Sequence, residues 1–297
     1  MKKSMKLAVA ALAVAGVGAG STAIAAEQMG VSKNEIVIGT IQDLSGPLAG
    51  FGKALRFGMQ MRVDEVNEAG GINGRKLKFI AEDSGYDPKK GLLAAQKMVQ
   101  QDKIFAMVGT IGTAVNLATF PTLFDKNVMN LFPLTAAREM YEPLHKLKFS
   151  FAAPYYTQIR MGVKWLAKER GAKKFCVIYQ DDDFGTEVLK GAEDGLKDIN
   201  MTFAEKTSFK RGATDFSAQV AKMKASDCDT VVLGTIIRET IGTIRDSRKV
   251  GWNPQFIGSS AAYTDLIHKL GGKAMDGLYG MHQVAVPYAD DSSKNVR

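Results

Sequence analysis

Acidic side chains follow two of the strands that the sequence predicts, and they are the first candidates for chemistry. The run Asp181–Asp183 stands between a predicted strand and a predicted helix, and Glu82 with Asp83 ends another predicted strand. Such groups could hold a cation or transfer protons, but an aspartate before a helix also caps the helix and suits its dipole. Because no histidine or second acidic cluster accompanies either group, we interpret both as structural.

The other reactive side chains form no catalytic pattern. His145, His268 and His282 lie far apart, with no ligand-type partner at helical spacing, and are interpreted as surface or helix-end residues. The sequence has no Gly-x-x-x-x-Gly-Lys-Ser/Thr phosphate loop and no Gly-x-Ser-x-Gly elbow. Cys176 and Cys228 fall near the starts of two predicted strands, which is compatible with a disulfide and equally with two buried thiols. We therefore predict no enzyme activity, no cofactor and no metal site.

A Gly-Thr pattern recurs at the ends of three predicted strands, in Ile38–Ile41, Val108–Ile111 and Leu233–Ile236. Ligands of open parallel sheets lie beyond the carboxyl ends of the strands. Small residues there let backbone N–H groups approach a ligand, and a following helix N-terminus favours an anion. A tight strand-to-helix turn would explain any one instance equally well. Three instances spread over both halves of the chain favour a cleft between two lobes.

Strands and helices alternate along the chain after residue 34. Apolar strands are predicted at Glu35–Ile41, Lys76–Glu82, Phe105–Gly109, Val128–Phe132, Lys174–Tyr179, Thr202–Ser208, Thr230–Gly234, Phe256–Gly258 and Gly277–Met281. Helices are predicted between them, at Gly50–Ala69, Asp87–Gln101, Tyr155–Arg170, Phe184–Asp198, Asp215–Ala225, Arg238–Val250 and Thr264–Leu270, with one more after Gly109 that Pro121 should break or open. Continuous apolar strands joined by helices indicate parallel sheets covered on both faces, and two such runs indicate two α/β lobes.

The composition excludes several classes of protein. The 297 residues are 45% hydrophobic and 24% charged, which is typical of a folded chain rather than a disordered one. The formal net charge is +8 and becomes +5 without residues 1–26. The remaining basic residues are scattered among acidic ones, unlike the basic stripe of a nucleic-acid binder, so no nucleic-acid partner is expected.

The first 26 residues read as a secretory signal peptide. Lys2, Lys3 and Lys6 form a positive region, Leu7–Ala19 is apolar, and Ala23-Ile24-Ala25 offers the small residues that a signal peptidase needs. Cleavage is expected after Ala25 or Ala26. The apolar run is shorter than the roughly 20 residues that span a bilayer, so a membrane anchor is disfavoured. The mature protein is expected in a periplasm.

From Ile36 onward the sequence resembles the class I periplasmic solute-binding proteins of ABC transporters, of the branched-chain amino-acid-binding, leucine-binding type. The resemblance rests on the order and spacing of several stretches: IVIGTIQDLSGPLAGFG, NEAGGINGRKL, EDSGYDP, VGTIGT, CVIYQDDDFG, TDF and FIGSS. It implies two doubly wound lobes joined by a hinge that close on a small ligand. The implied division is a signal peptide at 1–26, an N-terminal lobe at 27–152, a C-terminal lobe at 153–281, and the start of a return to the first lobe at 282–297. The implied protein is a monomer that delivers its ligand to membrane permease subunits.

The resemblance also implies a set of ligand-binding residues. Ile111, Gly112 and Thr113 match the segment that holds a ligand carboxylate, and Ser260 stands where amino-acid binders place an acid facing the ligand ammonium. Aromatic or apolar wall positions and the next ligand-facing turn correspond to Phe51, Leu134, Ala136, Phe184 and Ile236. Tyr155 and Tyr263 are added as hydroxyl donors for a substituent on the ligand.

Ser260 directs the prediction of ligand class. A buried ammonium without a charged partner costs several kcal/mol. We therefore expect a carboxylate without an amino group, such as an aromatic or other hydrophobic acid, rather than leucine or valine. Glu239 or Asp265 could instead swing in to supply the missing acid.

Two departures from the family and two alternative functions remain. Cysteines that pair in some members would fall at Tyr86 and Gly112, and are absent. The chain stops at Arg297, soon after a second crossover expected at Met281–Pro287, so part of the first lobe should expose apolar surface.

A secreted sensor domain of the same fold would need a further transmembrane or kinase segment. A nucleotide-dependent α/β enzyme would need a fingerprint that the sequence lacks.

Overall fold

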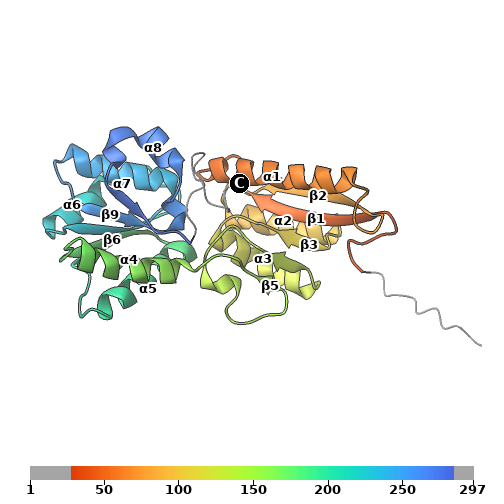
Figure 1. The fold of residues 1–297 in the computed structure, drawn as a ribbon, viewed down its shortest axis with the longest axis horizontal. Helices are drawn as coiled ribbons and strands as arrows, with labels where there is room; N and C mark the ends of the chain where they lie inside the picture. The colour runs from red at the N-terminus through yellow and green to blue at the C-terminus, as the bar shows by residue number, and fades with distance from the viewer. Residues whose placement is uncertain (1–27, 284–297) are drawn as a thin grey trace, which may run out of the picture.

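The computed structural model describes residues 28–283, which form two lobes arranged side by side (Figure 1). The predicted signal peptide at 1–26 lies outside the described residues, as does most of the segment 282–297. Among residues 28–283 no helix combines the length and the apolar character needed to cross a membrane.

The first lobe is built on a parallel sheet of five strands in the order β2-β1-β3-β4-β5. Its core packs Ile41, Met98, Met107 and Leu123 between the sheet and two helices. The strands are β1 (Glu35–Gln42), β2 (Lys76–Asp83), β3 (Ala106–Val108), β4 (Met129–Leu131) and β5 (Lys148–Phe149), and the helices are α1 (Ala49–Glu68), α2 (Pro88–Gln100) and α3 (Thr113–Asp125).

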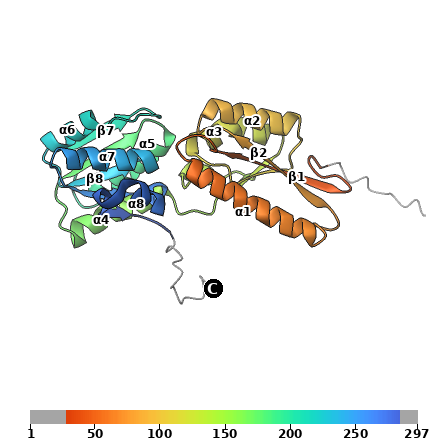
Figure 2. The ribbon, with the colours of Figure 1, turned by 90° about the horizontal axis from the view of Figure 1, so that it is seen from above.

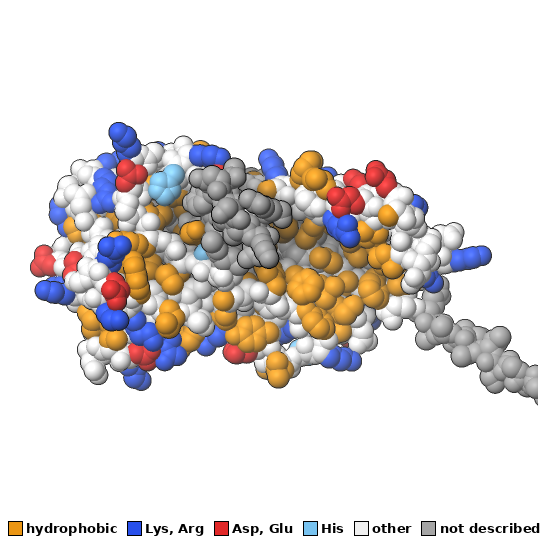
Figure 3. Space-filling model, in the orientation of Figure 1, with side chains coloured by type: hydrophobic (Ala, Val, Ile, Leu, Met, Phe, Trp, Pro, Cys, Tyr) orange, Lys and Arg blue, Asp and Glu red, His pale blue; other side chains and the backbone are white. Residues whose placement is uncertain are grey.

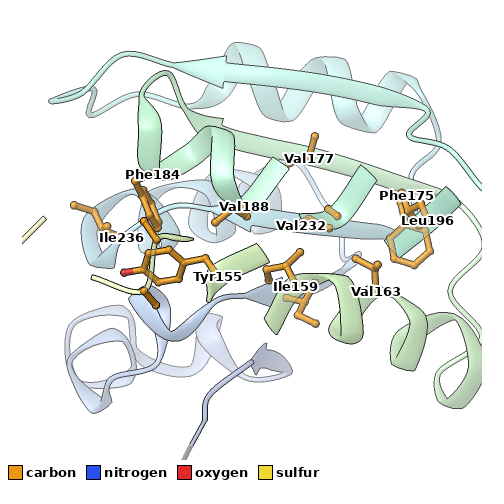
Figure 4. Close-up of a cluster of buried hydrophobic side chains, with 14 of the residues drawn as sticks. Tyr155, Ile159, Val163, Phe175, Val177, Phe184, Val188, Leu196, Val232 and Ile236 are labelled. Atoms are coloured by element: carbon orange, nitrogen blue, oxygen red, sulfur yellow. The ribbon is translucent and has the colours of Figure 1, made fainter. Parts of the chain in front are cut away.

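The second lobe repeats this architecture with the strand order β10-β9-β8-β6-β7, again with every pair parallel. Figure 4 shows one of its cores, where Val163 and Val188 of two helices meet Val177 and Val232 of the sheet. The strands are β6 (Phe175–Gln180), β7 (Glu205–Phe209), β8 (Thr230–Gly234), β9 (Gln255–Gly258) and β10 (Leu278–Gly280), and the helices are α4 (Tyr155–Glu169), α5 (Asp183–Lys197), α6 (Ser217–Ala225), α7 (Ile237–Lys249) and α8 (Asp265–Gly271).

Residues 150–154 connect the two lobes and run from β5 to the start of α4 (Figure 2). The residues after β10 begin with Met281, whose backbone N–H donates to the carbonyl of Gly258 of β9.

The predicted fold class is confirmed: the chain forms two α/β lobes with parallel sheets. Helix α2 begins as expected, with Pro88 in its first turn and the Asp87 carboxylate accepting from the N–H groups of Lys89 and Lys90. The expectation for Pro121 is wrong, because α3 runs continuously from Thr113 to Asp125. Phe120 and Leu123 of this helix pack in the lobe interior. Their burial stabilises the continuous helix by more than the loss of the one hydrogen bond that proline removes.

Cys176 and Cys228 form a disulfide with a Cα–Cα distance of 5.8 Å. It links the start of β6 to the residues just before β8, and these two strands pair directly. The structure therefore decides between the two alternatives that the sequence left open.

The first lobe exposes several large apolar side chains. Phe57 on α1 is 68% exposed, Phe149 on the edge strand β5 is 43% exposed and Phe151 beyond it is 58% exposed. Figure 3 shows hydrophobic side chains gathered on this lobe, on the side that faces the viewer.

Candidate functional site

A cavity of about 140 Å³ lies between the two lobes. Its size is comparable to the ~150 Å³ of an engineered apolar cavity that holds benzene, so it suits a small molecule. All of the ligand-binding residues predicted from the sequence line it: Phe51, Ile111, Gly112, Thr113, Leu134, Ala136, Tyr155, Phe184, Ile236, Ser260 and Tyr263. The structure thus brings the whole predicted set together, at the carboxyl ends of strands from both lobes.

The loop between β1 and α1 is shaped by Asp43. The Asp43 carboxylate is fully buried and accepts hydrogen bonds from the N–H groups of Gly46 at 2.5 Å and Leu48 at 2.6 Å. Gly52 packs so closely on this turn that a Cβ there would stand 2.1 Å from the Asp43 carbonyl oxygen. This local structure places Leu48 and Phe51 against the cavity.

Asp83 at the end of β2 supports the same loop. Its carboxylate accepts from the Leu44 N–H at 2.8 Å, the Ser45 hydroxyl at 2.6 Å and the Gly85 N–H at 2.8 Å. Burial alone would raise the pKa of Asp83, but these hydrogen bonds outweigh it and lower the pKa below the ordinary value. The interpretation of Asp83 as structural is therefore confirmed.

Asp182, from the acidic run after β6, is also occupied with structural contacts. Its Oδ1 accepts from the Gly185 N–H at 3.2 Å and caps α5, and its Oδ2 pairs with Arg211 and with the amide of Gln180. These contacts confirm the structural interpretation of Asp182.

The N-terminus of α3 gives the cavity a hydrogen-bond-donating end. Gly112 precedes the helix with φ at +95°, a conformation that favours glycine. Among residues 28–283, no hydrogen bond uses the backbone N–H groups of Thr113, Ala114 or Val115. Free N–H groups at a helix start, together with the helix dipole, form a site that favours an anion.

Two threonine hydroxyls lie beside this helix start. Thr113 Oγ1 and Thr135 Oγ1 are 2.7 Å apart and both side chains are buried. Burial raises the pKa of the Tyr155 hydroxyl, and hydrogen bonds involving the Ala136 backbone and Thr135 only partly oppose this shift. Tyr155 therefore stays a neutral phenol that can share its hydrogen bonds with a ligand.

Apolar and aromatic side chains form the middle of the cavity. The rings of Tyr155 and Phe184 meet edge to face, with centroids 5.1 Å apart and planes at 78° (Figure 4). Ile236, at the end of β8, lies beside them in the same core. Phe51, Ile111 and Leu134 contribute the wall from the first lobe.

The second lobe supplies polar, uncharged side chains to the cavity. Ser260 and Tyr263 line the cavity, and the Tyr263 ring lies against the His282 ring with centroids 4.6 Å apart. No acidic side chain is among the described residues that line the cavity.

Neither acid that was considered as a replacement for the missing charge reaches the cavity. Glu239 is buried at the start of α7 and pairs with Arg238, and Asp265 is exposed and pairs with Lys269. Ser260, which the resemblance predicts at the ammonium end of the site, brings a neutral hydroxyl to the cavity lining.

The two lobes are in direct contact beside the cavity. The Gln180 amide of the second lobe donates to the Tyr86 hydroxyl of the first at 3.3 Å. The Arg211 guanidinium donates to the Tyr86 carbonyl oxygen at 2.5 Å and lies over the Tyr86 ring, with 4.3 Å from Cζ to the ring centroid. These contacts hold the two lobes against each other beside the cavity.

Several lining residues escaped the sequence analysis: Leu48, Tyr86, Thr135, Phe151, Ala152, Ala261, His282 and Gln283. Thr135 stands between two residues that were predicted, so its hydroxyl could have been found by extending that turn. His282 and Gln283 follow β10, and no local pattern marks them as neighbours of the cavity.

Comparison with known proteins gives consistent results. Residues 35–296 match the model of the family described as periplasmic binding protein. The Leu/Ile/Val-binding protein of Escherichia coli K12 is 24% identical over 260 residues, which cover 88% of this chain and 70% of that protein.

Solved structures give the same fold. A substrate-binding periplasmic protein from Ralstonia solanacearum superposes with a TM-score of 0.75 at 27% identity, covering 82% of this chain and 69% of its own. A fatty acid ABC transporter substrate-binding protein from Thermomonospora curvata superposes with a TM-score of 0.77 at 22% identity, covering 85% and 64% of the two chains, and shows the fold alone.

Proposed function

The chain belongs to the periplasmic binding protein family, and on that premise we propose that it is the substrate-binding component of an ABC importer. It is exported, loses its signal peptide after Ala25 or Ala26, captures a small carboxylate between its lobes in the periplasm, and delivers it to a membrane permease. It works as a monomer and performs no catalysis. The relatives are binding proteins by name, which supports this proposal.

The ligand carboxylate binds at the start of α3. The N–H groups of Thr113 and Ala114 and the hydroxyl of Thr113 are the donors that it meets, and the helix dipole adds a favourable field. The Thr113 and Thr135 hydroxyls already hydrogen-bond each other, so Thr113 is held in place before the ligand arrives. This end of the site belongs to the first lobe, which can take the ligand before the second lobe closes.

The apolar body of the ligand lies between Phe51 of the first lobe and Phe184 with Ile236 of the second. Closure removes this body from water, and each Å² of apolar surface that is buried contributes about 25 cal/mol. Affinity therefore depends on contacts from both lobes.

The ligand is an organic acid without an amino group, of aromatic or other hydrophobic character. The observation that carries this proposal is the absence of an acidic side chain among the described lining residues. An ammonium buried there would keep no charged partner, at a cost of several kcal/mol. The Thermomonospora curvata protein of the same fold is a fatty acid ABC transporter substrate-binding protein by name, and a fatty acid has no amino group, which supports this proposal.

A branched-chain amino acid is the second candidate. The Escherichia coli relative is a Leu/Ile/Val-binding protein by name, which supports this candidate. In that case the ammonium would have to be held by carbonyl and hydroxyl oxygens alone, with Ser260 among them.

A thermal-shift panel separates the two candidates. Leucine, isoleucine and valine are compared with benzoate, cinnamate and a medium-chain fatty acid. A ligand at a hundred times its dissociation constant stabilises the folded state by about 2.7 kcal/mol. We expect stabilisation by at least one amine-free acid. Stabilisation by leucine, and by none of the amine-free acids, would assign the site to amino acids instead.

Mass spectrometry of the protein purified without added ligand tests the class independently. The mass of any retained molecule identifies it without a choice of panel.

A further inference from the structure

The hydroxyl of Tyr86 receives a hydrogen bond but gives none to the residues that the structure describes. Tyr86 follows β2 in the first lobe, is 3% exposed and lines the cavity. The side-chain nitrogen of Gln180, in the second lobe, donates to the Tyr86 oxygen at 3.3 Å. Across residues 28–283 no group accepts the Tyr86 hydrogen. A buried O–H group in the wall of a cavity is costly without an acceptor, and an oxygen atom of a ligand would supply one.

The direction of the bond from Gln180 is fixed by a second partner of the same nitrogen. This nitrogen also donates to Oδ2 of Asp182, and an ionised carboxylate can only accept. The Tyr86 oxygen is therefore the acceptor in its bond with Gln180, and the phenol hydrogen remains available. Burial raises the pKa of the Tyr86 hydroxyl, so the group is neutral and keeps this hydrogen at neutral pH.

The ring of Tyr86 brings the hydroxyl to the anion end of the cavity. A Cβ on Gly112 would stand 2.8 Å from Cε2 of Tyr86, the ring carbon next to the one that carries the hydroxyl. Gly112 directly precedes α3, whose first N–H groups form that end of the cavity together with the Thr113 hydroxyl. The phenol thus lies beside the helix start where the proposed carboxylate binds.

Contacts from both lobes hold the ring in this place. The Arg211 guanidinium of the second lobe lies over the ring, with 4.3 Å from Cζ to the centroid, and donates to the Tyr86 carbonyl oxygen. In the first lobe the Tyr86 N–H donates to the Ser84 hydroxyl at 3.2 Å, in a turn where Tyr86 has a φ of +63°. Residues other than glycine rarely adopt this conformation, so the surrounding contacts determine where the ring lies.

We propose that Tyr86 is a further ligand-binding residue, whose hydroxyl donates a hydrogen bond to the carboxylate of the ligand. This proposal rests on the proposed function, because it adds one donor to the carboxylate site at the start of α3. It does not depend on whether the ligand carries an amino group. The Gln180 amide occupies a lone pair of the phenol oxygen and so leaves the phenol hydrogen to the ligand.

Tyr86→Phe tests the proposal, because it removes only the hydroxyl and keeps the ring against Gly112. Calorimetry measures the affinities of the parent protein and the variant for benzoate, cinnamate, octanoate and leucine. For each acid that binds the parent protein, we expect the dissociation constant of the variant to rise roughly ten- to hundredfold, as for the loss of a hydrogen bond to a charged group. The unfolding temperature of the ligand-free variant should change little, whereas a purely structural role would lower it and leave the affinity unchanged.

Two further variants separate the ligand contact from the contact between the lobes. Gln180→Met removes the interlobe bond but leaves the Tyr86 hydroxyl, so it should weaken binding less than Tyr86→Phe does. Tyr279→Phe removes a phenol hydroxyl on β10, where the ring packs against Trp165 outside the cavity lining, and should leave the affinity unchanged.

An unchanged affinity in Tyr86→Phe would overturn the proposal. An equal loss in Gln180→Met would also overturn it, because the contact between the lobes would then explain the effect. If Tyr86→Phe does not fold, Tyr86→Met takes its place: a larger loss than in Gln180→Met supports the proposal, and an equal or smaller one overturns it.

The proposed function fails in a different way. If none of the four acids binds the parent protein, the carboxylate ligand is ruled out and the role of Tyr86 with it. If an acid binds the parent protein and Tyr86→Phe equally well, the proposed function stands and only the role of Tyr86 is lost.

Discussion

The guanidinium of Arg138 in the first lobe and the carboxylate of Glu187 in the second form two parallel hydrogen bonds, Nε to Oε1 at 2.8 Å and Nη2 to Oε2 at 3.0 Å. The Glu187 side chain is only 2% exposed and the Arg138 side chain 29%. The Arg138 guanidinium also lies over the Tyr156 ring, 3.8 Å from its centroid. The pair is therefore a direct ionic contact between the two lobes, with its carboxylate buried.

Glu187→Gln is expected to weaken ligand binding, because it removes charge from a contact that joins the two lobes between which the proposed ligand is held. A hydrogen bond to a charged group is worth about 1.5–3 kcal/mol, and ~1.4 kcal/mol corresponds to a factor of ten in affinity. Calorimetry with the acid that stabilises the parent protein most should therefore show a dissociation constant raised about tenfold or more.

A matched control lies on the same helix. Glu193 of α5 forms a surface ion pair with Lys206, and such exposed pairs contribute only about 0–1 kcal/mol. Glu193→Gln should leave the affinity almost unchanged. Equal losses in the two variants would show that the Arg138 pair has no special role in closure.

Thr113→Val is expected to reduce affinity for a carboxylate ligand. The variant keeps the shape of the side chain but removes the hydroxyl that faces the anion end of the cavity and bonds Thr135. The loss of a bond to a charged ligand predicts a dissociation constant raised about tenfold or more in calorimetry. Thr113→Ser, which retains the hydroxyl, is the control and should bind nearly as well as the parent. An unchanged affinity in Thr113→Val would remove this hydroxyl from the site.

In the Glu239→Gln variant, the free energy of unfolding is expected to fall less than in the parent protein as the pH rises. Burial raises the pKa of Glu239 above the ordinary value, and the attraction of Arg238 offsets this only in part. Its Oε2 has no hydrogen-bond partner among the described residues. With a raised pKa the folded state keeps the proton longer than the unfolded state, so stability falls as the pH rises from the unfolded pKa through the folded one.

Urea unfolding at a series of pH values from about 4 upward, near the unperturbed pKa of a glutamate, measures this effect. The stability of Glu239→Gln should decline less steeply than that of the parent and should equal or exceed it at neutral pH. The exposed change Glu68→Gln serves as a control for the removal of one carboxylate. A steeper decline in Glu239→Gln than in the parent would contradict the raised pKa of Glu239.

The double change of Cys176 and Cys228 to Ala is expected to lower the free energy of unfolding by about 2–4 kcal/mol. The disulfide links residues that are 52 positions apart, and removing it gives the unfolded chain more freedom. A reducing agent should lower the unfolding temperature of the parent and leave that of the double variant unchanged. Two reactive thiols in the unfolded parent protein under non-reducing conditions would show that the disulfide does not form.

Much of the fold follows from local sequence. Residues such as Asp87, Pro88 and Gly112 have conformational preferences that favour the start of a helix. Continuous apolar runs such as Val231–Leu233 are buried because exposure of such a run to water is unfavourable. Most elements could therefore be predicted to within a few residues. The short strand β5 was missed, because two residues give no periodicity and only pairing with β4 defines it.

The residues that line the cavity could be predicted because the sequence resembles a known family whose ligand-facing positions could be matched one by one, and some of them also follow short strand-end patterns. Ile111–Thr113 and Ile236 directly follow the Gly-Thr turns. These turns lie at the carboxyl ends of strands, and this position can be read from the local sequence alone. Parallel order in each sheet then collects these ends at one edge, which is a property of the topology.

Tertiary structure alone decided the contacts between segments that are distant in sequence. The Gln158 side chain of α4 donates a hydrogen bond to Gln283, which is 125 positions away in the sequence. Arg138 forms its ion pair with Glu187 across 49 positions. It also decided that Cys176 and Cys228 are bonded and that Glu239 and Asp265 stay outside the cavity. The physical reason is that a residue's type limits the bonds it can make, whereas its partner is selected only when the packing of both lobes brings two such groups within hydrogen-bond distance.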